Sequence, residues 1–585
     1  MQAESRRAAR TQRSRAEVQR RHRRRARVWI AVGVLTIIVL SALTWLAIKA
    51  LTVKNELEAA KSLIANLDDG LELDARLSLV GDHAVQAVRA ANDPLWAAAE
   101  SVPVAGENLR AVRLASEALD LIVNDIAMPV LSVKDDPSTA SLLPAILPIL
   151  ETNAPALDRL ATDMDTLLSA TTLIGPVRSG IEQVGSVTTM AAPLVRALPS
   201  LLGVEAPKSY LLVFQNNAEA LPLGGSAASQ TLVSADSGNL AITAQASSAS
   251  FTPGVPVDVA VDQSALDLYS SYLVDHVNTS TSRPDFPTAA KILRAFWNRD
   301  IDPTPIDGVV SIDPIALGRV LLATGPITVS NVEISSDNAL QVLLSDAYEW
   351  WNPYASVAEA AASDAFFAGV AQTVFAKLST GEFDLKDMAW AVSESIQRGN
   401  IMLWSEDPHV AGLTEGERLS GALPADDAEH ATVGVFFRNT SASKIDFYMN
   451  SAVDVSQSCE AGTTSFTATA TLNLDITQAD ADALPPYVKS GTAGSERFRT
   501  EVFVYGPVGT VATGLAADGV AVNPLRSDIR DLGRPVISFE MYIAPGATET
   551  VTATFSGDGE FGPLDVRTTP MIRETAVTTS ARCGQ

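Results

Sequence analysis

The longest apolar stretch lies near the start of the chain. Residues 28–48 read VWIAVGVLTIIVLSALTWLAI and contain no charged side chain. A helix needs about 20 apolar residues to cross the hydrocarbon core of a bilayer. A secretory signal peptide is the alternative, but its apolar region is shorter and ends at a small-x-small cleavage site, and Ala47-Ile48-Lys49 is a poor one. We therefore predict a retained transmembrane helix over residues 28–48.

Apolar side chains at three- and four-residue spacing follow this run as far as about residue 200. Leu57, Ala60 and Ile64 form one such face, and another begins near Leu109. This period is typical of amphipathic helices. The pattern predicts a helical stalk or bundle over residues 50–200, with a substrate-binding helical domain as the alternative.

The period shortens at Ser209, where the run SYLLVF predicts a buried strand. Two alternating runs around a DSGN turn then predict a hairpin. Farther on, residues 308–312 predict a strand and residues 314–324 predict a helix. Because strands and helices that alternate are typical of α/β proteins, we predict an α/β domain over residues 205–430.

Strand-like segments separated by turns fill the last quarter of the chain. They include VGVFFRN, KIDFYMN, TTSFTATATLNLDI, ERFRTEVFVYG, PVISFEMYI and TETVTATFSG. Regular short strands are typical of a β-sandwich, which we predict over residues 431–585. The predicted fold class is therefore multidomain: one N-terminal transmembrane helix, a helical stalk, an α/β domain and a C-terminal β-sandwich.

The chain has two cysteines, Cys459 and Cys583. If this part of the chain lies outside the cytoplasm, an oxidising compartment permits a disulfide between them, and we predict one. Two free thiols are the alternative. Neither the number nor the spacing of the cysteines suits a zinc site, and we predict no metal site.

Charge is distributed unevenly along the chain, whose formal net charge is −25. Residues 1–27 hold eleven arginines against Glu4 and Glu17. Basic residues beside a membrane span stay in the cytoplasm, so we predict a basic cytoplasmic tail over residues 1–27 and an extracytoplasmic region over residues 50–585. The acidic body repels polyanions at long range. We expect membrane contact through residues 28–48 and no nucleic-acid partner, while the oligomeric state stays open.

Catalytic motifs of the phosphate-binding-loop, nucleophile-elbow and H-E-x-x-H kinds do not occur in the sequence, which identifies no catalytic residue. Polar side chains gather instead directly after the strand predicted from Ser209. A polar loop at a strand end can bind a ligand, whereas amides bonded to the backbone would make it a structural loop. Both interpretations stay open for the candidate ligand-binding residues of this loop, which are Gln215, Asn216, Asn217, Glu219, Gly224 and Gly225.

A second candidate group combines arginines with aspartates. Guanidinium groups bind phosphate through pairs of hydrogen bonds, and ordinary surface ion pairs are the alternative. The members of this group are Arg294, Arg299, Asp300, Asp307 and Arg319. A third group, EWWNPY at residues 349–354, contains aromatic rings that stack on sugars in some proteins. Core packing is the commoner role of such rings, and we expect it here.

Three segments resemble a bacterial family of domains of unknown function, number 4012. They are PLWAAAESVPVAGENLRAVRLASEALDLI at residues 94–122, YLLVFQNNAEALPLGG at residues 210–225, and IDGVVSIDPIALGRVLLATGPITV at residues 306–329. The resemblance implies a single-span envelope protein with a large outer region. It implies no activity, because none is established for the family.

A more distant resemblance lies in the order of the elements. A strand, a polar loop, a hairpin and a helix before DGVVSIDPIAL are similar in order to the LytR-CpsA-Psr family. Those enzymes transfer glycopolymers from polyprenyl-phosphate lipids to the cell wall with arginines, aspartates and usually a divalent metal. One departure weakens this comparison. The closer family usually has an arginine where Leu221 stands, and arginine is the residue best suited to a pyrophosphate.

Together these features predict an extracytoplasmic, membrane-anchored envelope protein without a cofactor. We expect it to bind or assemble a cell-envelope glycopolymer or a polyprenyl-linked glycan. The first alternative is a phosphotransferase similar to LytR-CpsA-Psr enzymes, which would use a divalent metal. The second alternative is a purely structural envelope protein.

Overall fold

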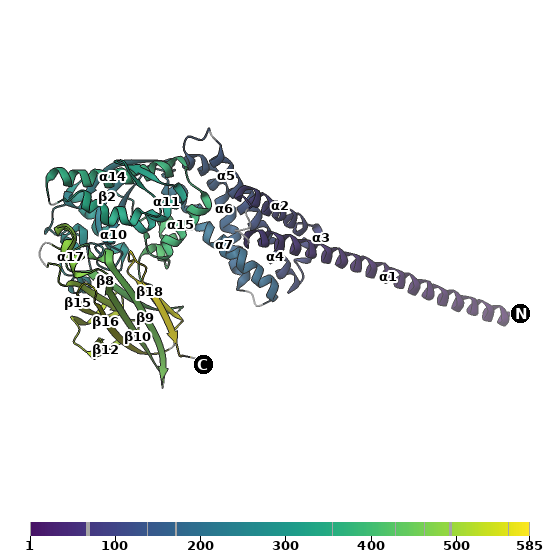
Figure 1. Cartoon of the computed structure of the whole chain (residues 1–585). Coiled ribbons are helices and arrows are strands. Elements are labelled where there is room, and N and C mark those ends of the chain that lie inside the picture. Colours follow the sequence, from purple (N-terminus) through teal and green to yellow (C-terminus); the bar gives the residue numbers. More distant parts are fainter. Residues whose placement is uncertain are drawn as a thin grey trace. The chain divides into compact units, whose positions relative to one another are not determined.

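The computed structural model of the chain describes residues 2–65, 71–136, 138–169, 172–353, 355–427, 429–460, 462–490, 494–559 and 561–583, with side chains from Trp29 onward. Two compact units make up the chain. The first combines Met1–Asp136 with Pro148–Val195, and the second combines Pro137–Leu147 with Arg196–Gln585. Helices come first in the chain and several sheets follow, as the sequence predicts (Figure 1).

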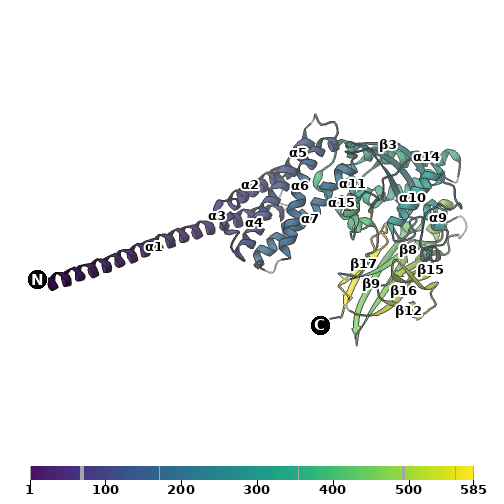
Figure 2. The same ribbon diagram turned by 180° about the vertical axis from the view of Figure 1, so that it is seen from behind.

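The first unit is built of helices, which Figure 2 shows from behind. Its complete helices are α1 (Gln2–Ala65), α2 (Leu73–Ala91), α3 (Pro94–Ala99), α4 (Ala105–Asp120), the π-helix η1 (Leu121–Ala127) and α5 (Met128–Asp135). Most of α6 (Leu142–Leu168) and α7 (Gly175–Leu201) also belongs to it.

Small side chains let the helices of this unit approach one another closely. Val53 of α1 is buried with Ala87 and Ala90 of α2, and Trp96 of α3 closes the same cluster. The Trp96 indole Nε1 donates a hydrogen bond to the Leu109 carbonyl at 3.2 Å. The apolar faces predicted from the helical period are therefore the faces that meet in the bundle.

α1 runs without a break from the basic tail through the apolar run and into the bundle. Among the described residues, its segment 29–65 is the one helix long and apolar enough to cross a membrane, as a membrane anchor or a signal sequence would be. Apolar side chains from Trp29 to Ile48 are largely exposed along it, whereas Val53 and Ala60 are buried.

The second unit begins with a five-stranded sheet of order β3-β2-β1-β4-β7. Its strands are β1 (Lys208–Asn216), β2 (Ser226–Asp236), β3 (Asn239–Ser247), β4 (Gly308–Ile312) and β7 (Ile401–Ser405). β1 and β4 are parallel, with Tyr210 opposite Gly308, and the other pairs are antiparallel. This region mixes strands and helices, as predicted.

Helices and one small hairpin surround this sheet. They are η2 (Ser248–Ser250), α8 (Gln263–Tyr269), α9 (Tyr272–Asp275), η3 (Val277–Thr279), α10 (Phe286–Asp300), α11 (Pro314–Thr324), β5 (Ile327–Val329), β6 (Val332–Ile334), α12 (Ala339–Gln341), η4 (Val342–Asp346), α13 (Ala347–Trp350), α14 (Val357–Thr380), α15 (Leu385–Gln397), α16 (Pro408–Thr414) and η5 (Arg418–Ser420).

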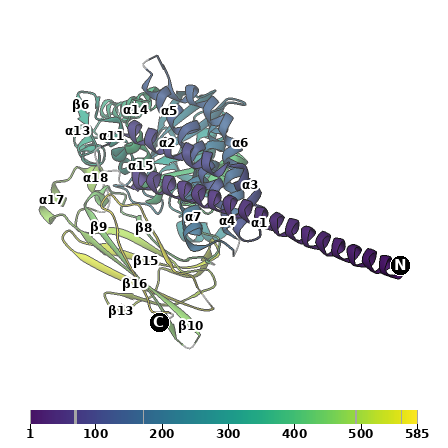
Figure 3. The same ribbon diagram turned by 90° about the vertical axis from the view of Figure 1, so that its right-hand side faces the viewer.

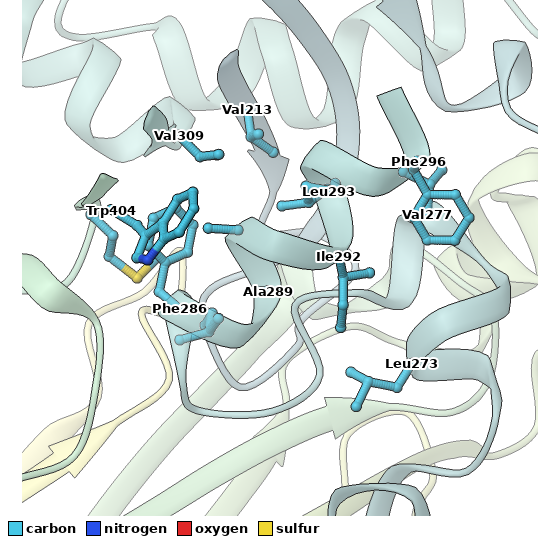
Figure 4. Packing of buried hydrophobic residues seen from close by; sticks show 14 of the residues in the cluster. Val213, Leu273, Val277, Phe286, Ala289, Ile292, Leu293, Phe296, Val309 and Trp404 are labelled. Atoms are coloured by element: carbon cyan, nitrogen blue, oxygen red, sulfur yellow. The ribbon is translucent and has the colours of Figure 1, made fainter. Parts of the chain in front are cut away.

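α10 packs its apolar face on the sheet. Val213 of β1 and Val309 of β4 lie in one cluster with Phe286 and Leu293 of α10 and Trp404 of β7 (Figure 4). Burying each such side chain contributes roughly 1.5–3 kcal/mol to stability. This core fixes the parallel pair β1 and β4, and so the edge where both strands end.

The C-terminal part is rich in β structure and contains two sheets (Figure 3). The six-stranded sheet has the order β13-β12-β16-β10-β9-β18, and the five-stranded sheet has the order β14-β15-β11-β8-β17. Buried residues of both sheets, such as Phe466 of β10 and Phe437 of β8, share one core. The elements are β8 (Ala431–Asn439), η6 (Ile445–Tyr448), β9 (Met449–Glu460), β10 (Thr463–Leu474), α17 (Gln478–Ala483), α18 (Pro486–Lys489), β11 (Phe498–Tyr505), β12 (Val511–Ala517), β13 (Val520–Ala521), β14 (Arg526–Asp531), β15 (Arg534–Ile543), β16 (Thr548–Asp558), β17 (Leu564–Thr568) and β18 (Ala576–Ala581).

Two sequence predictions for this part have different outcomes. The disulfide between Cys459 and Cys583 is confirmed. The strand predicted for KIDFYMN is wrong in its first half, because Ile445–Tyr448 forms a 3-10 helix before β9 begins. The buried Asp446 carboxylate there accepts hydrogen bonds from outside the segment, and these contacts override its strand-like pattern.

Buried polar contacts join the sheet region to the β-rich part. The Arg283 guanidinium donates to both carboxylate oxygens of Asp531, at 3.1 and 2.6 Å. The hydroxyl groups of Tyr269 and Tyr505 lie 2.7 Å apart, and the Tyr505 hydroxyl donates to Asp531 at 3.0 Å. These groups are buried, so the two regions form one packed body.

Candidate functional site

The loop from Gln215 to Gly225 lies where β1 ends. Because β1 and β4 are parallel, it lies beside Asp313, the residue that follows β4. The pairing of β1 with β2 shifts register between Phe214 and Gln215. This edge is where open α/β sheets bind ligands, so the contacts of the loop decide between its two interpretations.

The three amide side chains of the loop are buried and bonded within the protein. Gln215 Nε2 donates to Ser311 Oγ at 2.5 Å, and its Oε1 accepts from the Gly225 amide at 2.8 Å. Asn216 Nδ2 donates to the Tyr348 hydroxyl at 2.7 Å, and its Oδ1 accepts from the Ala218 amide at 3.0 Å. These two side chains hold the turn in shape.

Asn217 reaches two other regions of the fold. Its Nδ2 donates to Asp313 Oδ2 and to the Pro570 carbonyl, both at 3.0 Å. Asn400 Nδ2 donates to the same Asp313 oxygen at 2.7 Å, and Arg319 Nη1 donates to Asn400 Oδ1 at 2.7 Å. Arg319 is thus tied to the loop through Asn400 and Asp313. Burial raises the pKa of the Asp313 carboxyl and lowers that of the Arg319 guanidinium.

Glu219 bonds to the β-rich part. Its carboxylate pairs with the buried Lys444 and accepts from the Ser226 hydroxyl. The Lys444 ammonium lies 4.5 Å from the ring centroid of Tyr348 and 4.8 Å from that of Tyr487. Burial lowers the pKa of Lys444, but the Glu219 carboxylate and the neighbouring Tyr348 and Tyr487 together more than offset this, and the net shift is upward. Lys444 is therefore a charged ammonium group paired with Glu219 and packed against the Tyr348 and Tyr487 rings, which we call the aromatic box.

A second carboxylate lies beside this pair. Asp446 Oδ2 accepts from the Ala220 amide at 3.0 Å and from Asn439 Nδ2 at 2.6 Å. Its Oδ1 is buried without a hydrogen-bond partner among the described residues. Burial raises the pKa of Asp446 to about 7, with a further contribution from the Glu219 charge.

The two glycines of the loop are required by its backbone. Gly224 has a φ of 128°, a value that side chains rarely permit. A Cβ at Gly225 would lie 2.1 Å from the Asn216 carbonyl oxygen, which is too close. Gly224 is therefore required by its backbone conformation, and Gly225 by the close approach of the Asn216 carbonyl.

The predicted arginine and aspartate group does not assemble at this loop, except for Arg319. Asp307 precedes β4 and so lies at the opposite edge, where its carboxylate accepts from the Ser209 amide at 2.8 Å. Arg294 pairs there with Glu406 at 2.9 Å. Arg299 pairs with its neighbour Asp300 at 2.6 Å, at the end of α10. These pairs are local ion pairs.

The aromatic group at residues 349–354 divides between core and surface. The Trp351 ring lies 4.8 Å from that of the buried Phe366, between ring centroids. Trp350 is exposed, and Tyr354 lies outside the described residues.

An open hollow lies beside the loop. Pro222 and Leu223 of the loop line it together with three arginines, Arg398, Arg418 and Arg567. The sequence did not identify these arginines, because none of them lies in a recognisable motif and they are far apart along the chain. We call this set the arginine hollow.

Ion pairs hold the three guanidinium groups in place. Arg418 Nη2 donates to Asp565 Oδ1 at 3.0 Å, and Arg567 Nε donates to Asp565 Oδ2 at 2.6 Å. Arg398 pairs with Glu394 and with the exposed Glu574. Burial and the neighbouring Arg567 lower the pKa of Arg418. No three His, Cys, Asp or Glu side chains of the described ranges group as metal ligands would, and we derive no step through a metal.

Residues 205–348 match a family described as "Protein of unknown function (DUF4012)". The match covers β1, the polar loop and β4 and ends at Tyr348, which bonds to Asn216. It supports the first resemblance seen in the sequence for this part of the chain, and it assigns no activity.

Other similarities are weak. No curated protein matches the chain. Among solved structures, Lin1025 from Listeria innocua shares 16% identity over 37% of this chain and 80% of its own, with a TM-score of 0.21. The Legionella pneumophila protein lpg2210 shares 9% identity over 22% of this chain and 44% of its own, with a TM-score of 0.15. Similarity at this level supports no conclusion about function.

Proposed function

We propose that this protein is anchored in the cell membrane by α1 and binds a phosphate-bearing envelope glycopolymer or polyprenyl-linked glycan at the arginine hollow. In this proposal residues 1–27 are cytoplasmic and residues 50–585 are extracytoplasmic. The apolar run beside a basic tail supports the anchor, and the disulfide between Cys459 and Cys583 supports an oxidising compartment.

One observation carries the binding site. Arg418 and Arg567 share a single carboxylate, that of Asp565, so two positive charges face one negative charge. Guanidinium groups present paired donors that match the oxygens of a phosphate. The hollow also lies at the edge where β1 and β4 end, the usual position of ligands in α/β sheets.

The buried amides of the loop are less suited to bind a ligand than the arginine hollow. Gln215, Asn216 and Asn217 already donate to groups of the protein. Binding a ligand through them would break buried hydrogen bonds, at about 1–3 kcal/mol for each group left unsatisfied. Arg418 and Arg567 would keep their half-buried Asp565 carboxylate and share it with the ligand, so no buried polar group need be left unsatisfied.

Binding can be tested with the full-length protein in nanodiscs that contain a polyprenyl phosphate. We expect saturable binding that weakens at least tenfold in the double variant Arg418→Gln/Arg567→Gln. Arg499→Gln is the matched control, because Arg499 lies elsewhere on the β-rich part and pairs with Glu540. Equal binding by the two variants would exclude the hollow, and no binding by the unaltered protein would favour a structural role.

The orientation has its own test. A cysteine placed within residues 1–27 should resist a membrane-impermeant thiol reagent in intact cells. A cysteine at Ser527, which is exposed on β14, should react. The reverse pattern would contradict the orientation without affecting the hollow.

A phosphotransferase remains the second candidate. The arginine hollow lies beside the loop and supplies the guanidinium groups that the loop itself lacks at Leu221. A transferase would move the glycan from its polyprenyl phosphate carrier to a cell-wall acceptor. Loss of carrier-linked glycan with gain of wall-linked glycan, over time and at catalytic amounts of protein, would establish this activity. Binding without turnover would establish the first proposal.

A further inference from the structure

The bundle of the first unit has one end at which α1 enters it. Trp45 Nε1 of α1 donates to Asp93 Oδ2 at 3.0 Å, and the Lys49 ammonium lies 3.7 Å from the same oxygen. Asp93 caps α3 by accepting from the Leu95 amide. α3 is therefore level with Trp45, a residue type that favours the membrane interface.

The apolar run of α1 extends past this level. It ends at Ile48, three residues beyond Trp45. Because an α-helix rises 1.5 Å per residue, α3 contacts α1 about 4.5 Å before the apolar run ends. If α1 spans a bilayer, this end of the bundle lies within the polar interface of the membrane. The bundle and the span are not separated by a linker.

Two loops lie at the same end. One joins α3 to α4, and the other joins α6 to α7. Asn108 ties them together, because its Nδ2 donates to the Val104 carbonyl at 2.8 Å and to the Thr172 carbonyl at 3.1 Å, and its Oδ1 accepts from the Ile174 amide at 2.9 Å. We call α3 with residues 100–104 and 172–174 the bundle tip.

The bundle tip exposes apolar side chains. The exposed fractions are 41% for Leu95, 51% for Val102, 55% for Val104 and 57% for Ile174. Val104 also has a φ of 67°, a conformation that is strained for a β-branched residue. Exposure of the valine side chain to water is unfavourable, and its transfer into an apolar medium would lower the free energy.

Acidic side chains in and beside the bundle tip are bonded to partners. Glu100 accepts two hydrogen bonds from Arg113, at 2.7 and 3.2 Å, and Glu107 accepts one from Thr172. Asp93 has Trp45 and Lys49 as partners, and these contacts, led by the Trp45 hydrogen bond, lower its pKa. The acids are thus held by the protein, while the apolar side chains point outward.

We infer that the bundle tip inserts into the outer interface of the membrane that α1 crosses, with Leu95, Val102, Val104 and Ile174 in contact with lipid. The inference rests on α1 being a membrane anchor, which is part of the proposed function. It adds a second lipid contact, and it fixes the bundle against the membrane surface instead of leaving it free to tilt.

The test uses full-length protein in vesicles that contain lipids with a nitroxide near the headgroup. Single cysteines at Val104 and at Ile174 carry an environment-sensitive fluorophore, while the native disulfide stays intact. Met190→Cys is the matched control, since Met190 is 76% exposed and lies on α7, 16 residues after Ile174, which is about 24 Å along the helix. Ile38→Cys, in the middle of the apolar run, reports on the span itself.

We expect the nitroxide lipids to quench fluorophores at positions 104 and 174 at least twofold more than the one at position 190. Position 38 should be quenched by nitroxides placed deep in the acyl chains. Tip positions quenched no more than position 190, with position 38 quenched, would overturn the inference and leave the anchor intact. Tip positions shielded from both lipid and aqueous quenchers would also overturn it, because a protein would then cover them. Absence of quenching at position 38 would overturn the anchor and the inference together.

Discussion

Two polar clusters lie at the same edge of the five-stranded sheet, one behind the other. The loop from Gln215 to Gly225 is buried and its amides are bonded to the protein. The arginine hollow lies in front of it, and two of its guanidinium groups share one carboxylate. The difference teaches that a dense polar stretch in a sequence can mark a joint between regions, while the groups that we propose bind a ligand come from separate segments.

The two clusters should therefore respond to mutation in opposite ways. Changes in the loop and its partners should cost stability, because they leave buried polar groups unsatisfied. Changes in the hollow should cost ligand binding and less stability than changes in the loop, because the pairs with Asp565 are partly exposed to solvent.

The largest effect is expected for Lys444→Met. This change leaves the half-buried Glu219 unpaired beside the aromatic box, and removal of one partner of a buried ion pair costs up to about 3–5 kcal/mol. The measurement is the free energy of unfolding of the detergent-solubilised protein by denaturant. Lys489→Met is the control, because the Lys489 ammonium bonds at the surface to the Asp482 carbonyl. A loss below about 1 kcal/mol would show that the joint does not depend on this pair.

Asp446 should make stability depend on pH. Its pKa of about 7 is raised above the usual 3.8, so the protonated form is favoured in the folded protein. The resulting stability is present at pH 4 and is lost as the pH rises through 7, by about 3–4 kcal/mol. Asp446→Asn should abolish most of this dependence between pH 4 and pH 8, as measured by unfolding at each pH. Parallel pH profiles for the variant and the unaltered protein would contradict the assignment.

Gly225→Ala should destabilise the loop by about 1–3 kcal/mol, the usual cost of forcing atoms into a packed site. The added methyl group would meet the Asn216 carbonyl, and the neighbouring Asn217 would have to move. Gly412→Ala is the matched comparison, because Gly412, like Gly225, lacks a positive φ but has no atom within 4 Å of the added Cβ. If both variants lose the same stability, the cost does not come from the close approach.

The smallest effect on stability is expected in the hollow. Arg418→Gln/Arg567→Gln should change the free energy of unfolding by less than about 1 kcal/mol, although it should abolish most of the ligand binding. Unfolding and binding measured on the same preparation would separate the two effects. A large loss of stability would mean that Asp565 and its arginines belong to the joint.

The sequence predicted the broad order of elements because the spacing of apolar residues indicates which side of a helix or strand is buried. The apolar run, the helical spacing that follows it and the alternating strands of the C-terminal part all appear in the structure. The disulfide could be predicted because the chain has only two cysteines. KIDFYMN was harder, since Asp446 bonds to Ala220, a residue more than 200 positions earlier.

The candidate site was less predictable for a related reason. The loop looks like a site in the sequence because its polar side chains are adjacent, but their partners are Ser311, Tyr348, Asp313 and Lys444, which no local pattern identifies. The arginines of the hollow come from the end of α15, from η5 and from β17. Only the three-dimensional fold brings these segments together.

The order of strands in the C-terminal part has a consequence for how the protein is made. β17 covers the edge of β8 in one sheet, and β18 covers the edge of β9 in the other. A chain that stopped before Leu564 would leave both edges open, and open edges recruit other chains. Folding therefore has to reach β17 and β18 before both edges are covered, and a product truncated before them would be prone to aggregation. The bond between Cys459 of β9 and Cys583, which follows β18, can form only after both of these strands have been made, and it then holds β18 near the edge that it covers.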